Sequence, residues 1–442
     1  MHISVIGLGK LGAPLAAILA DRGHDVVGVD TSPHIVELLN QGRTVVQEPG
    51  LADLVEENRS RLRATTDAAA AVAATDVSFI VVPTPSTSSG TFSTRFVTDA
   101  VAQVGRGLRQ KSGYHVVAVT STVMPMSTAL EVRPALERAS GRIVGDTVGL
   151  CYNPEFIALG SVIHDMTHAD LVLIGESDAR AGDLIEAVHR TFIADTTEVR
   201  RMSWINAEIA KIAVNTFVTT KISYANMLAE LCERMPGGDV DVVTGAIGVD
   251  RRIGHRYLRG AVGYGGPCFP RDNAALAAAA AQVGARAELA VVTDAINRRQ
   301  VDRVAEIVRG RAAPPQDRIG VLGLSYKPDT PVTEESQGVM LANRLAGDGY
   351  AVTAFDPAAR EGAAPALAAS ISLAGSLADC LAVSDLVVVM VPWPAFGEIP
   401  ALVRGTPRRP RVIVDCWRLL KAADLEGVAE LVYLGKAPLA QP

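Results

Sequence analysis

Short apolar runs alternate with stretches of helical periodicity in the N-terminal part of the chain. Residues 3–6 and 26–29 are apolar runs of strand length, and the alanine- and leucine-rich segment between them is expected to be helical as far as Arg22. Further apolar runs extend the same sheet at residues 77–82, 116–119 and 171–174. Apolar strands separated by helices predict a parallel sheet of the doubly wound α/β class.

The same pattern returns near the C-terminal end. Residues 318–330, a predicted helix at 336–348 and residues 351–356 echo the first strand, turn, helix and strand. Apolar runs at 386–391 and 412–415 extend this second sheet. The chain therefore predicts two related α/β halves. Pro314 and Pro315 mark the join to the second half, which lacks the full glycine pattern and is expected to bind a different nucleotide or none.

A long helix is predicted between the two halves. Neither proline nor glycine occurs from Ser203 to Arg234, the apolar residues recur with helical period, and Ser203 is the expected cap. The polar residues recur every three or four positions and form one stripe: Glu208, Lys211, Asn215, Thr219 and Ser223. Such a stripe is either a solvated face or, on a rod this apolar, a face turned to a cleft. Alanine-rich runs at 68–74 and 277–281 are expected to be helical.

Three glycines follow the first strand with the spacing of a dinucleotide-binding turn. Gly7, Gly9 and Gly12 permit a tight turn, the approach of a pyrophosphate to a helix N-terminus and close helix packing. Asp30 ends the second strand, where a ribose 2′-hydroxyl would lie, and its charge disfavours a 2′-phosphate. The sequence predicts NAD rather than NADP, with a glycine-rich turn of another α/β protein as the alternative.

One cysteine lies in a glycine-rich segment, residues 263–272, just before a helix expected to begin near Asp272. A thiolate at a helix N-terminus is stabilised by unsatisfied backbone N–H groups and the macrodipole, so Cys268 is predicted to be a nucleophile. A buried structural cysteine is the alternative. The remaining cysteines are scattered without a Cys-x-x-Cys pair, and all five are expected to be reduced: Cys151, Cys232, Cys380 and Cys416, besides Cys268.

Composition narrows the function classes. The 442 residues suffice for two or three domains, and a formal net charge of −6 argues against a nucleic-acid partner. Because no apolar run reaches the length of a membrane span and Met1 leads directly into a strand, no membrane segment or signal peptide is expected and the location is predicted to be cytoplasmic. His164 and His168, with Asp165 and Asp170 nearby, lack the glutamate of a zincin pattern, so no metal site is predicted.

An ordered series of motifs over nearly the whole chain resembles the UDP-glucose/GDP-mannose dehydrogenase family. The motifs are Gly7-x-Gly-x-x-Gly12, Val82-Pro-Thr-Pro85, Ser121-Thr-Val123, Asn153-Pro-Glu-Phe156, Ala207-Glu-Ile-Ala-Lys211-x-x-x-Asn215, Arg252-Ile-Gly254, residues 263–272 and Lys327-Pro-Asp-Thr330. The resemblance implies two Rossmann-like doubly wound domains joined by a central helical domain with one long helix. It implies an NAD-binding domain at 1–200, a helical dimerisation domain at 201–300 and a nucleotide-sugar-binding domain at 301–442.

The resemblance also implies an activity. The expected reaction is the NAD-dependent oxidation of a sugar primary alcohol to a carboxylate in two steps, through a cysteine thiohemiacetal and thioester, with UDP-glucose giving UDP-glucuronate. Alternatives are another nucleotide hexose of the GDP-mannose, dTDP-glucose or UDP-N-acetylhexosamine type, a single-oxidation β-hydroxyacid dehydrogenase sharing the lysine and asparagine pair, and a non-catalytic nucleotide-sugar-binding regulator. The implied partners are the nucleotide sugar and further copies of the chain, in a homodimer or higher oligomer whose substrate site is shared between subunits.

Roles for single residues follow from the same resemblance. Cys268 would be the nucleophile, Lys211 and Asn215 would donate to an alkoxide or oxyanion, Asp272 and Thr122 would hold the hydrolytic water, and Glu155 would act as a base or position that water. The implied NAD contacts are Gly7, Gly9, Leu11, Gly12 and Asp30, with Thr84, Thr122 and Glu155 on the nicotinamide side. The implied substrate contacts are Arg252 from a neighbouring subunit, Tyr257, Leu258, Gly263, Gly265, Lys327 and Arg418; for Arg418 a surface arginine is the alternative.

Three positions depart from the family pattern. Leu159 replaces a carboxylate near the substrate, which bears on sugar preference. Glu334 replaces an arginine, which weakens anion binding around the cofactor and nucleotide. Arg271 replaces a common lysine and keeps the charge.

Overall fold

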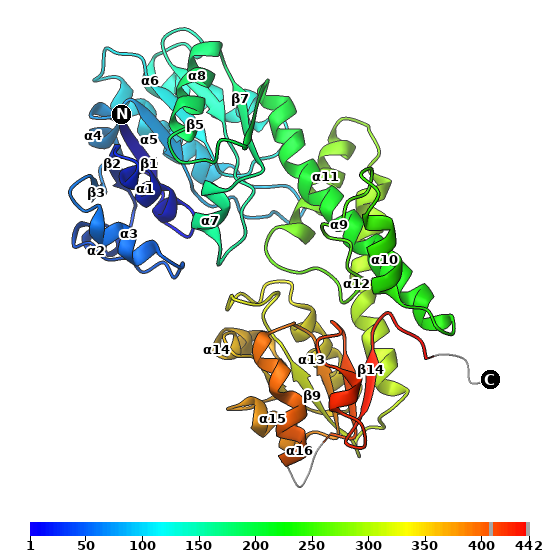
Figure 1. Ribbon diagram of the computed structural model, residues 1–442. Coiled ribbons are helices and arrows are strands. Elements are labelled where there is room, and N and C mark those ends of the chain that lie inside the picture. Colours follow the sequence, from blue (N-terminus) through cyan, green and yellow to red (C-terminus); the bar gives the residue numbers. More distant parts are fainter. Residues whose placement is uncertain (406–409, 439–442) are drawn as a thin grey trace. The chain divides into compact units, whose positions relative to one another are not determined.

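The computed structural model describes residues 1–405 and 410–438 of the chain. It divides into two compact units, Met1–Ala213 and Val214–Pro442 (Figure 1). Residues 439–442, at the end of the predicted C-terminal domain, and residues 406–409 lie outside the described part. No helix in the described ranges is long and apolar enough to cross a membrane.

The first unit is built on an eight-stranded sheet with the order β3-β2-β1-β4-β5-β6-β7-β8. Every neighbouring pair is parallel except β6 and β7, which are antiparallel. The strands are β1 His2–Ile6, β2 Asp25–Val29, β3 Leu62–Thr65, β4 Val77–Ile80, β5 Val116–Val119, β6 Gly149–Tyr152, β7 Leu171–Glu176 and β8 Glu198–Met202. β4, β5 and β6 are buried along their whole length and are mostly apolar, with Ser78 of β4 as a buried polar exception, so their sequences do not alternate between apolar and polar residues.

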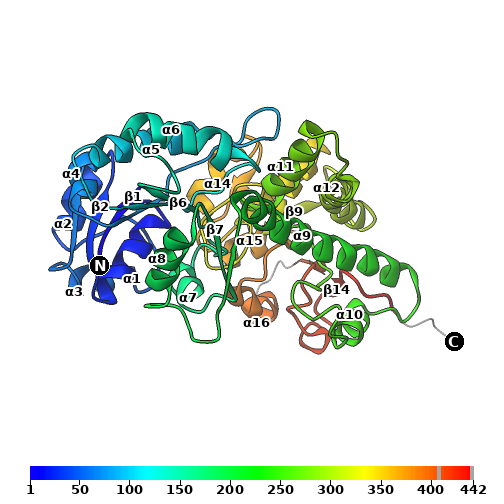
Figure 2. The same cartoon turned by 90° about the horizontal axis from the view of Figure 1, so that it is seen from above.

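Helices cover both faces of this sheet, and each face has its own apolar core. One face packs against α1, α3, α7 and α8, and the other against α4, α5 and α6, which is the layering visible in Figure 2. The helices are α1 Gly12–Asp21, α2 Pro33–Asn40, α3 Leu51–Glu57, α4 Ala68–Ala73, α5 Arg95–Leu108, the π-helix Thr128–Val132, α6 Arg133–Ser140, α7 Val162–Thr167 and α8 Ala179–His189. The predicted doubly wound class is confirmed for this half.

The predicted long helix is α9, Trp204–Arg234. Its 31 residues contain no helix breaker, and the boundary between the two units falls within it. The polar stripe is not solvated, because Glu208, Lys211, Thr219 and Ser223 are all buried, whereas Phe217, Tyr224 and Leu231 are exposed. Of the two interpretations of the stripe, the solvated face is wrong for these four residues, and α9 turns them inward while apolar side chains face outward.

The second unit continues with helices α10 Val240–Gly248, α11 Phe269–Gln282 and α12 Glu288–Arg309, and then a six-stranded parallel sheet. The sheet has the order β11-β10-β9-β12-β13-β14 and is coloured yellow to red in Figure 1. Its strands are β9 Arg318–Leu322, β10 Ala351–Phe355, β11 Ser372–Leu373, β12 Leu386–Val389, β13 Val412–Asp415 and β14 Glu430–Tyr433. Its helices are α13 Gln337–Gly347, α14 Arg360–Ala363, α15 Leu377–Val383 and α16 Ile399–Gly405, with 3-10 turns at Ala364–Ala366, Pro394–Glu398 and Ala422–Asp424.

The internal repeat predicted from the sequence holds at the level of atomic packing. In the first unit a Cβ on Gly12 would collide with the carbonyl oxygen of Gly7, so the helix can approach the turn only at glycine. In the second unit a Cβ on Gly338 would collide with the carbonyl oxygen of Gly323 in the same way. Both sheets also share the strand order 3-2-1-4-5-6 of the Rossmann fold. The two halves are therefore related α/β folds, as predicted.

Candidate active site

The glycine turn of the first unit leaves room where a phosphate would approach. Gly7 adopts a positive φ of 97°, and any side chain there would strike the carbonyl of Val81. A Cβ on Gly9, by contrast, would meet no protein atom within 4 Å. Leu11 stands at the N-cap position of α1 without a side-chain cap bond, so the first backbone N–H groups of the helix have no competing side-chain partner from Leu11. This turn fits a pyrophosphate.

Asp30 lies at the end of β2 and borders a cavity of about 380 Å³. One carboxylate oxygen accepts a 2.9 Å hydrogen bond from the Leu8 amide, and the other accepts one of 2.9 Å from the Ser32 amide. Each oxygen keeps lone pairs for a further donor, since a carboxylate has about four acceptor positions. The cavity is lined by Gly7, Val29, Thr31, Val82, Pro83 and Phe96, among others. An adenosine with a free ribose diol suits this chemistry.

The loops after β4 and β5 are tied together beside this turn. The hydroxyl of Ser121 donates to the Val82 carbonyl at 2.7 Å and accepts from the Val82 amide at 2.9 Å. These bonds fix the segment that carries Thr84, which is buried, and the segment that carries Thr122, which is partly exposed. In the sequence Ser121 is distinguished only as part of a motif, because its two hydrogen bonds depend on the spatial pairing of β4 with β5.

Lys211 on α9 points its ammonium at the loop after β6. Its Nζ donates to the Glu155 carbonyl oxygen at 2.6 Å and lies 4.5 Å from the centre of the Phe156 ring. Burial raises the pKa of the Glu155 carboxyl to about 7, against the smaller opposing effect of the Lys211 charge. A carboxyl that titrates near neutral pH is suited to proton transfer. Lys211 and Glu155, predicted separately, are thus neighbours within the first unit.

Glu208, one turn before Lys211, was named in the polar stripe but given no function by the sequence. Its carboxylate accepts hydrogen bonds from the Met126 amide at 2.6 Å and the Thr128 amide at 2.8 Å. Met126 has a left-handed φ of 77°, a conformation that costs energy in a non-glycine residue. Glu208 therefore holds the strained loop that follows Thr122. The sequence signal was a glutamate on an apolar helix, which requires a buried partner.

Cys268 is the exposed cysteine of the second unit, and the other four cysteines of the chain are buried. The structure corrects the predicted start of the following helix: α11 begins at Phe269, three residues before Asp272, and Cys268 is its N-cap residue. Pro270 makes the earlier start favourable, because a proline in the first helical turn loses no hydrogen bond. The thiol therefore stands closer to the helix N-terminus than the sequence indicated.

Asp272 and Asn215 form a direct pair in the second unit. The Asn215 Nδ2 donates a 2.6 Å hydrogen bond to one carboxylate oxygen of Asp272, and the guanidinium of Arg271 lies 3.5 Å from the other. Asp272 is 1% exposed and its amide donates to the Cys268 carbonyl at 2.8 Å. Because Asp272 lies within the first turn of α11, it is not the helix cap considered from the sequence. Cys268, Asp272 and Asn215 are brought together.

The loop before Cys268 packs against the start of the C-terminal α/β half. A Cβ on Gly265 would lie 2.4–3.2 Å from Glu335 and Tyr326, and the Gly266 amide donates to the Glu334 carbonyl at 2.9 Å. Burial, and secondarily the Cys268 charge, raises the pKa of Tyr326 to about 12. Lys327 follows Tyr326 and is half-buried. Tyr257, also on this loop, has a left-handed φ of 63° and contacts the Phe269 ring edge-on, while Leu258 is buried.

Two further predicted substrate contacts, Arg252 and Arg418, pair with aspartates of the second unit. Arg252 is exposed over 89% of its side chain and pairs with Asp250 beside it. Arg418 is neither a free ligand group nor a surface arginine, because its side chain is only 4% exposed and pairs with Asp241 on α10 through two hydrogen bonds of 2.6 and 2.9 Å. A third bond of 2.8 Å goes to the Leu434 carbonyl. The alternative that Arg418 is a surface arginine is therefore wrong. The bidentate pair with Asp241, which lies 177 residues away in the sequence, offsets the free-energy cost of burying the guanidinium.

The three departures from the family pattern have separate surroundings. Leu159 packs against the apolar core of the first unit together with Ile157. Glu334 is exposed and its carbonyl accepts from Gly266. Arg271 lies beside Asp272, as described above.

The second half lacks a free acid equivalent to Asp30. The matching residue, Asp356, accepts from the Leu324 amide at 2.7 Å just as Asp30 accepts from Leu8. It also accepts from the amide and hydroxyl of Ser325, the indole of Trp393 and the amides of Ala358 and Ala359. Six donors saturate this buried carboxylate, so it has no capacity for a ribose diol. Within the described residues, no group of three or more His, Cys, Asp or Glu side chains could hold a metal ion.

Three domain profiles of one protein family match the chain in order. They are the NAD binding domain of the UDP-glucose/GDP-mannose dehydrogenase family at residues 1–193, its central domain at 205–299 and its UDP binding domain at 320–422. The chain belongs to the UDP-glucose/GDP-mannose dehydrogenase family. It is 36% identical to UDP-glucose 6-dehydrogenase AglM of Haloferax volcanii over 95% of this chain and 97% of that protein.

Other members of the UDP-glucose/GDP-mannose dehydrogenase family are comparably similar. The GDP-mannose 6-dehydrogenase of Pseudomonas putida is 35% identical over 80% of this chain and 81% of that protein. Among solved structures, a UDP-glucose dehydrogenase from the archaeon Pyrobaculum islandicum superposes with a TM-score of 0.87 at 33% identity, covering 98% of this chain and 96% of that one. The predicted family, fold class, oxidoreductase class and NAD cofactor are confirmed, and the UDP binding domain supports a nucleotide-sugar substrate.

Proposed function

We propose that this chain is a UDP-glucose 6-dehydrogenase that makes UDP-glucuronate by two NAD-dependent oxidations of one carbon. The observation that carries the proposal is the arrangement in the second unit: an exposed Cys268 at the N-cap of α11, with Asp272 one turn on and hydrogen-bonded to Asn215. A dehydrogenase that stops at the aldehyde has no use for a nucleophilic thiol. A four-electron dehydrogenase needs one to retain the aldehyde between its two oxidations.

The first oxidation removes a hydride and a proton from the C6 alcohol and gives an aldehyde. NAD held at the Gly7 turn would accept the hydride released in each of the two oxidations. Lys211 supplies a buried cation beside the loop of Glu155, where it would stabilise the alkoxide from which the hydride departs. Glu155 would take up the proton, since its pKa of about 7 leaves it partly ionised at neutral pH.

The second oxidation proceeds on the enzyme-bound carbon. The Cys268 thiolate adds to the aldehyde carbon, its oxygen takes up a proton, and a thiohemiacetal forms. Loss of a second hydride, together with the hydroxyl proton, would leave a thioester. Water then adds to the thioester carbon, the carbon–sulfur bond breaks, and the carboxylate leaves while the thiol is restored. Asp272 and Thr122 would orient this water, and Asn215 would donate to the oxyanion.

The substrate residues are proposed from the loop geometry. One loop would contact the sugar and phosphates, through Tyr257, Leu258, Gly263 and Gly265. Lys327 lies beside the same loop and would contact the nucleotide. Arg252 would contact the substrate of a neighbouring subunit, a role that suits its exposed position. Arg418 would act by fixing α10 through Asp241 unless the substrate displaces that partner.

An oligomer is proposed from the surface of α9. Phe217, Tyr224 and Leu231 recur every seven residues and are 65, 49 and 48% exposed, a seam of the kind that pairs with another helix. A second copy of the chain would cover this seam. Arg252 of that copy would contribute to the substrate site. We further propose the division into domains at 1–200, 201–300 and 301–442, and a cytoplasmic location.

The test is a substrate panel with purified protein. UDP-glucose, GDP-mannose, dTDP-glucose and UDP-N-acetylhexosamines are each incubated with NAD, NADH is followed by absorbance, and the product is identified by mass. The expected result is two NADH for each UDP-glucuronate. One NADH per product would overturn the double oxidation, whereas a stronger signal with another sugar would retain the chemistry and replace the substrate.

A further inference from the structure

The loop that precedes Cys268 is buried but has no regular secondary structure. Residues 260–266 belong to neither a helix nor a strand, yet every one of them is buried. Buried backbone N–H and C=O groups must find partners, and here no neighbouring strand supplies them. The partners come instead from side chains, above all from two asparagines, Asn226 on α9 and Asn297 on α12.

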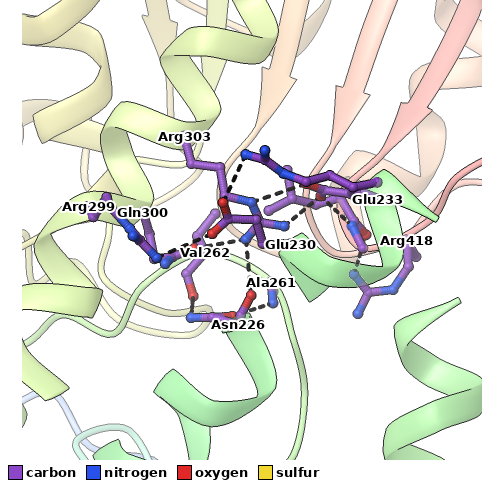
Figure 3. Close-up of polar contacts among 12 residues, drawn as sticks. Asn226, Glu230, Glu233, Ala261, Val262, Arg299, Gln300, Arg303 and Arg418 are labelled. Carbon is purple, nitrogen blue, oxygen red and sulfur yellow. Dashed lines mark hydrogen bonds and ion pairs between the residues drawn. The ribbon is translucent and has the colours of Figure 1, made fainter. Parts of the chain in front are cut away.

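Asn226 holds the first half of this loop. Its Oδ1 accepts a 2.8 Å hydrogen bond from the Ala261 amide, and its Nδ2 donates to the Val262 carbonyl at 3.1 Å, as Figure 3 shows. The side chain is 1% exposed. A primary amide offers a donor and an acceptor side by side, so Asn226 binds the loop as a neighbouring strand would.

Asn297 holds the second half with the same pair of bonds. Its Oδ1 accepts from the Tyr264 amide at 2.7 Å, and its Nδ2 donates to the Tyr264 carbonyl at 2.9 Å. It is 4% exposed. Gly263 separates the two grips, and a Cβ there would lie 2.5 Å from Asn297 Oδ1, so the loop can seat against this side chain only with glycine.

The helix that carries Asn226 is itself fixed. Arg303 on α12 donates to both carboxylate oxygens of Glu233 on α9, at 2.6 and 3.2 Å, and to Gln300 at 2.9 Å (Figure 3). Glu233 also accepts from the Gly435 amide at 2.6 Å. Arg303 is buried, so this pair is little screened by solvent. α9, α12 and the segment after β14 therefore form a rigid frame behind the loop.

A line of contacts leads from the second grip to the reactive cysteine. Tyr264 reaches Asn273 through its hydroxyl, to which the Asn273 Nδ2 donates at 3.2 Å. That nitrogen also lies within hydrogen-bond distance of Thr219 Oγ1 and the Phe269 carbonyl, at 2.9 and 3.0 Å. Asn273 adjoins Asp272 on α11, whose N-cap is Cys268. Displacing Tyr264 would thus disturb the start of α11.

We propose that Asn226 and Asn297 are positioning residues of the nucleotide-sugar reaction, which clamp residues 261–264 so that the loop before them meets the substrate and α11 presents Cys268. This rests on the proposed function. The two grips have separable consequences: Asn226 governs the part of the loop nearer Tyr257 and thus substrate affinity, whereas Asn297 governs Tyr264 and thus the reactivity of Cys268.

The test compares Asn226→Asp and Asn297→Asp, each of which keeps shape and acceptor but places an oxygen against a carbonyl oxygen. The matched control is Asn343→Asp, since Asn343 grips residues 366–368 with the same two bonds, of 2.8 Å each, in a surface loop away from these residues. Asn226→Ala and Asn297→Ala are second variants in case the charged ones fail to fold.

For Asn226→Asp the KM for UDP-glucose is expected to rise at least about tenfold with kcat changed less. For Asn297→Asp kcat and the alkylation rate of Cys268 by iodoacetamide are expected to fall at least about tenfold, with the KM for NAD unchanged in both. Equal changes in Asn343→Asp, or kinetic losses that only parallel the fall in melting temperature, would overturn the positioning role.

Hydrogen exchange separates the clamp from the function. The Ala261 amide is expected to exchange faster in Asn226→Ala, and the Tyr264 amide faster in Asn297→Ala, than in the wild type and in Asn343→Ala, because alanine removes the side-chain oxygen that each amide donates to. Unchanged exchange overturns the clamp whatever the activity. If the wild type oxidises no nucleotide sugar, the proposed function and the positioning role fall together, while faster exchange still establishes the clamp as a structural feature.

Discussion

The Asn215 side-chain amide donates a 2.6 Å hydrogen bond to the Asp272 carboxylate, and this bond joins α9 to the first turn of α11. Asp272 is almost fully buried, so the amide and the nearby Arg271 guanidinium are what stabilise its charge. Because the same turn of α11 begins at Cys268, the hydrogen bond orients a carboxylate one helical turn from the thiol.

Replacing Asn215 with aspartate is expected to lower kcat by about a hundredfold, because two carboxylates would face each other where a hydrogen bond now exists. Asp272→Asn, which keeps the shape and removes the charge, should lower kcat to a similar extent without this repulsion. Steady-state NADH formation measures both. The KM for NAD is the internal control, and its unchanged value is expected because the NAD residues belong to the first unit. Wild-type kcat in either variant would contradict the assignment.

Cys268 is expected to be the first cysteine modified when the folded protein is treated with iodoacetamide. Peptide mass analysis should find one adduct, since Cys151, Cys232, Cys380 and Cys416 are buried. Acid formation should stop in proportion to the adduct, and Cys268→Ser should form no UDP-glucuronate. Full turnover after complete modification of Cys268 would exclude the thioester route.

The rate is expected to rise with pH through about 7, because Glu155 must be ionised to accept a proton and burial raises its pKa to about 7. In Glu155→Gln this limb of the pH profile should disappear along with most of the activity. An unchanged limb would assign it to another group.

The contribution of Glu155 to the free energy of unfolding is expected to fall with rising pH, opposite to the trend of the rate. In the unfolded chain Glu155 ionises from about pH 4.5, but in the folded protein it stays neutral up to about 7. Folding therefore disfavours its ionisation, and its contribution to the free energy of unfolding falls as pH rises from 4.5 to 7. At pH 8 the melting temperature of Glu155→Gln should be equal to or above that of the wild type, and at pH 4.5 the difference should be smaller.

Asp30 and Asp356 occupy equivalent places in the two halves but should respond differently to removal of their charge. Asp30→Asn is expected to raise the KM for NAD about tenfold, because the Asp30 carboxylate keeps lone pairs for a ribose. Little change in the free energy of unfolding is expected for this variant. Asp356→Asn should lower the free energy of unfolding by about 2 kcal/mol or more, since its carboxylate serves six buried donors. NAD kinetics and urea unfolding, applied to both variants, give the comparison.

The exposed seam of α9 predicts the oligomeric state. Phe217→Lys should convert the assembly into monomers and abolish activity, since Arg252 of a neighbouring subunit would be lost from the site. Leu130→Lys is the control, because Leu130 is equally exposed but lies in the first unit on another element. Light scattering measures the mass. A wild-type protein that is already monomeric would refute both the oligomer and the shared site.

Much of the local structure could be predicted because it follows from short-range rules. The Gly7, Gly9 and Gly12 turn and Asp30 at the end of β2 are encoded within 30 residues, and each spacing has a steric reason that applies whatever the rest of the chain does. α9 likewise required only a long segment without breakers. α11 begins three residues before the predicted start, because Pro270 permits a helix to begin just ahead of it.

Only the tertiary structure decided which distant segments supply partners for each other's polar and charged groups. Periodicity located the polar stripe of α9 but not its partners, so it could not say that the stripe is buried and the apolar seam exposed. Periodicity could not show that Arg418 pairs with Asp241. Nor could it show that Asn226 and Asn297 bind a loop that lies more than thirty residues from each of them in the sequence. Sequence fixes the conformations available to a short segment, because sterics and helix periodicity act over a few residues. Whether a polar group is buried depends on the groups that meet it, and packing alone brings them together.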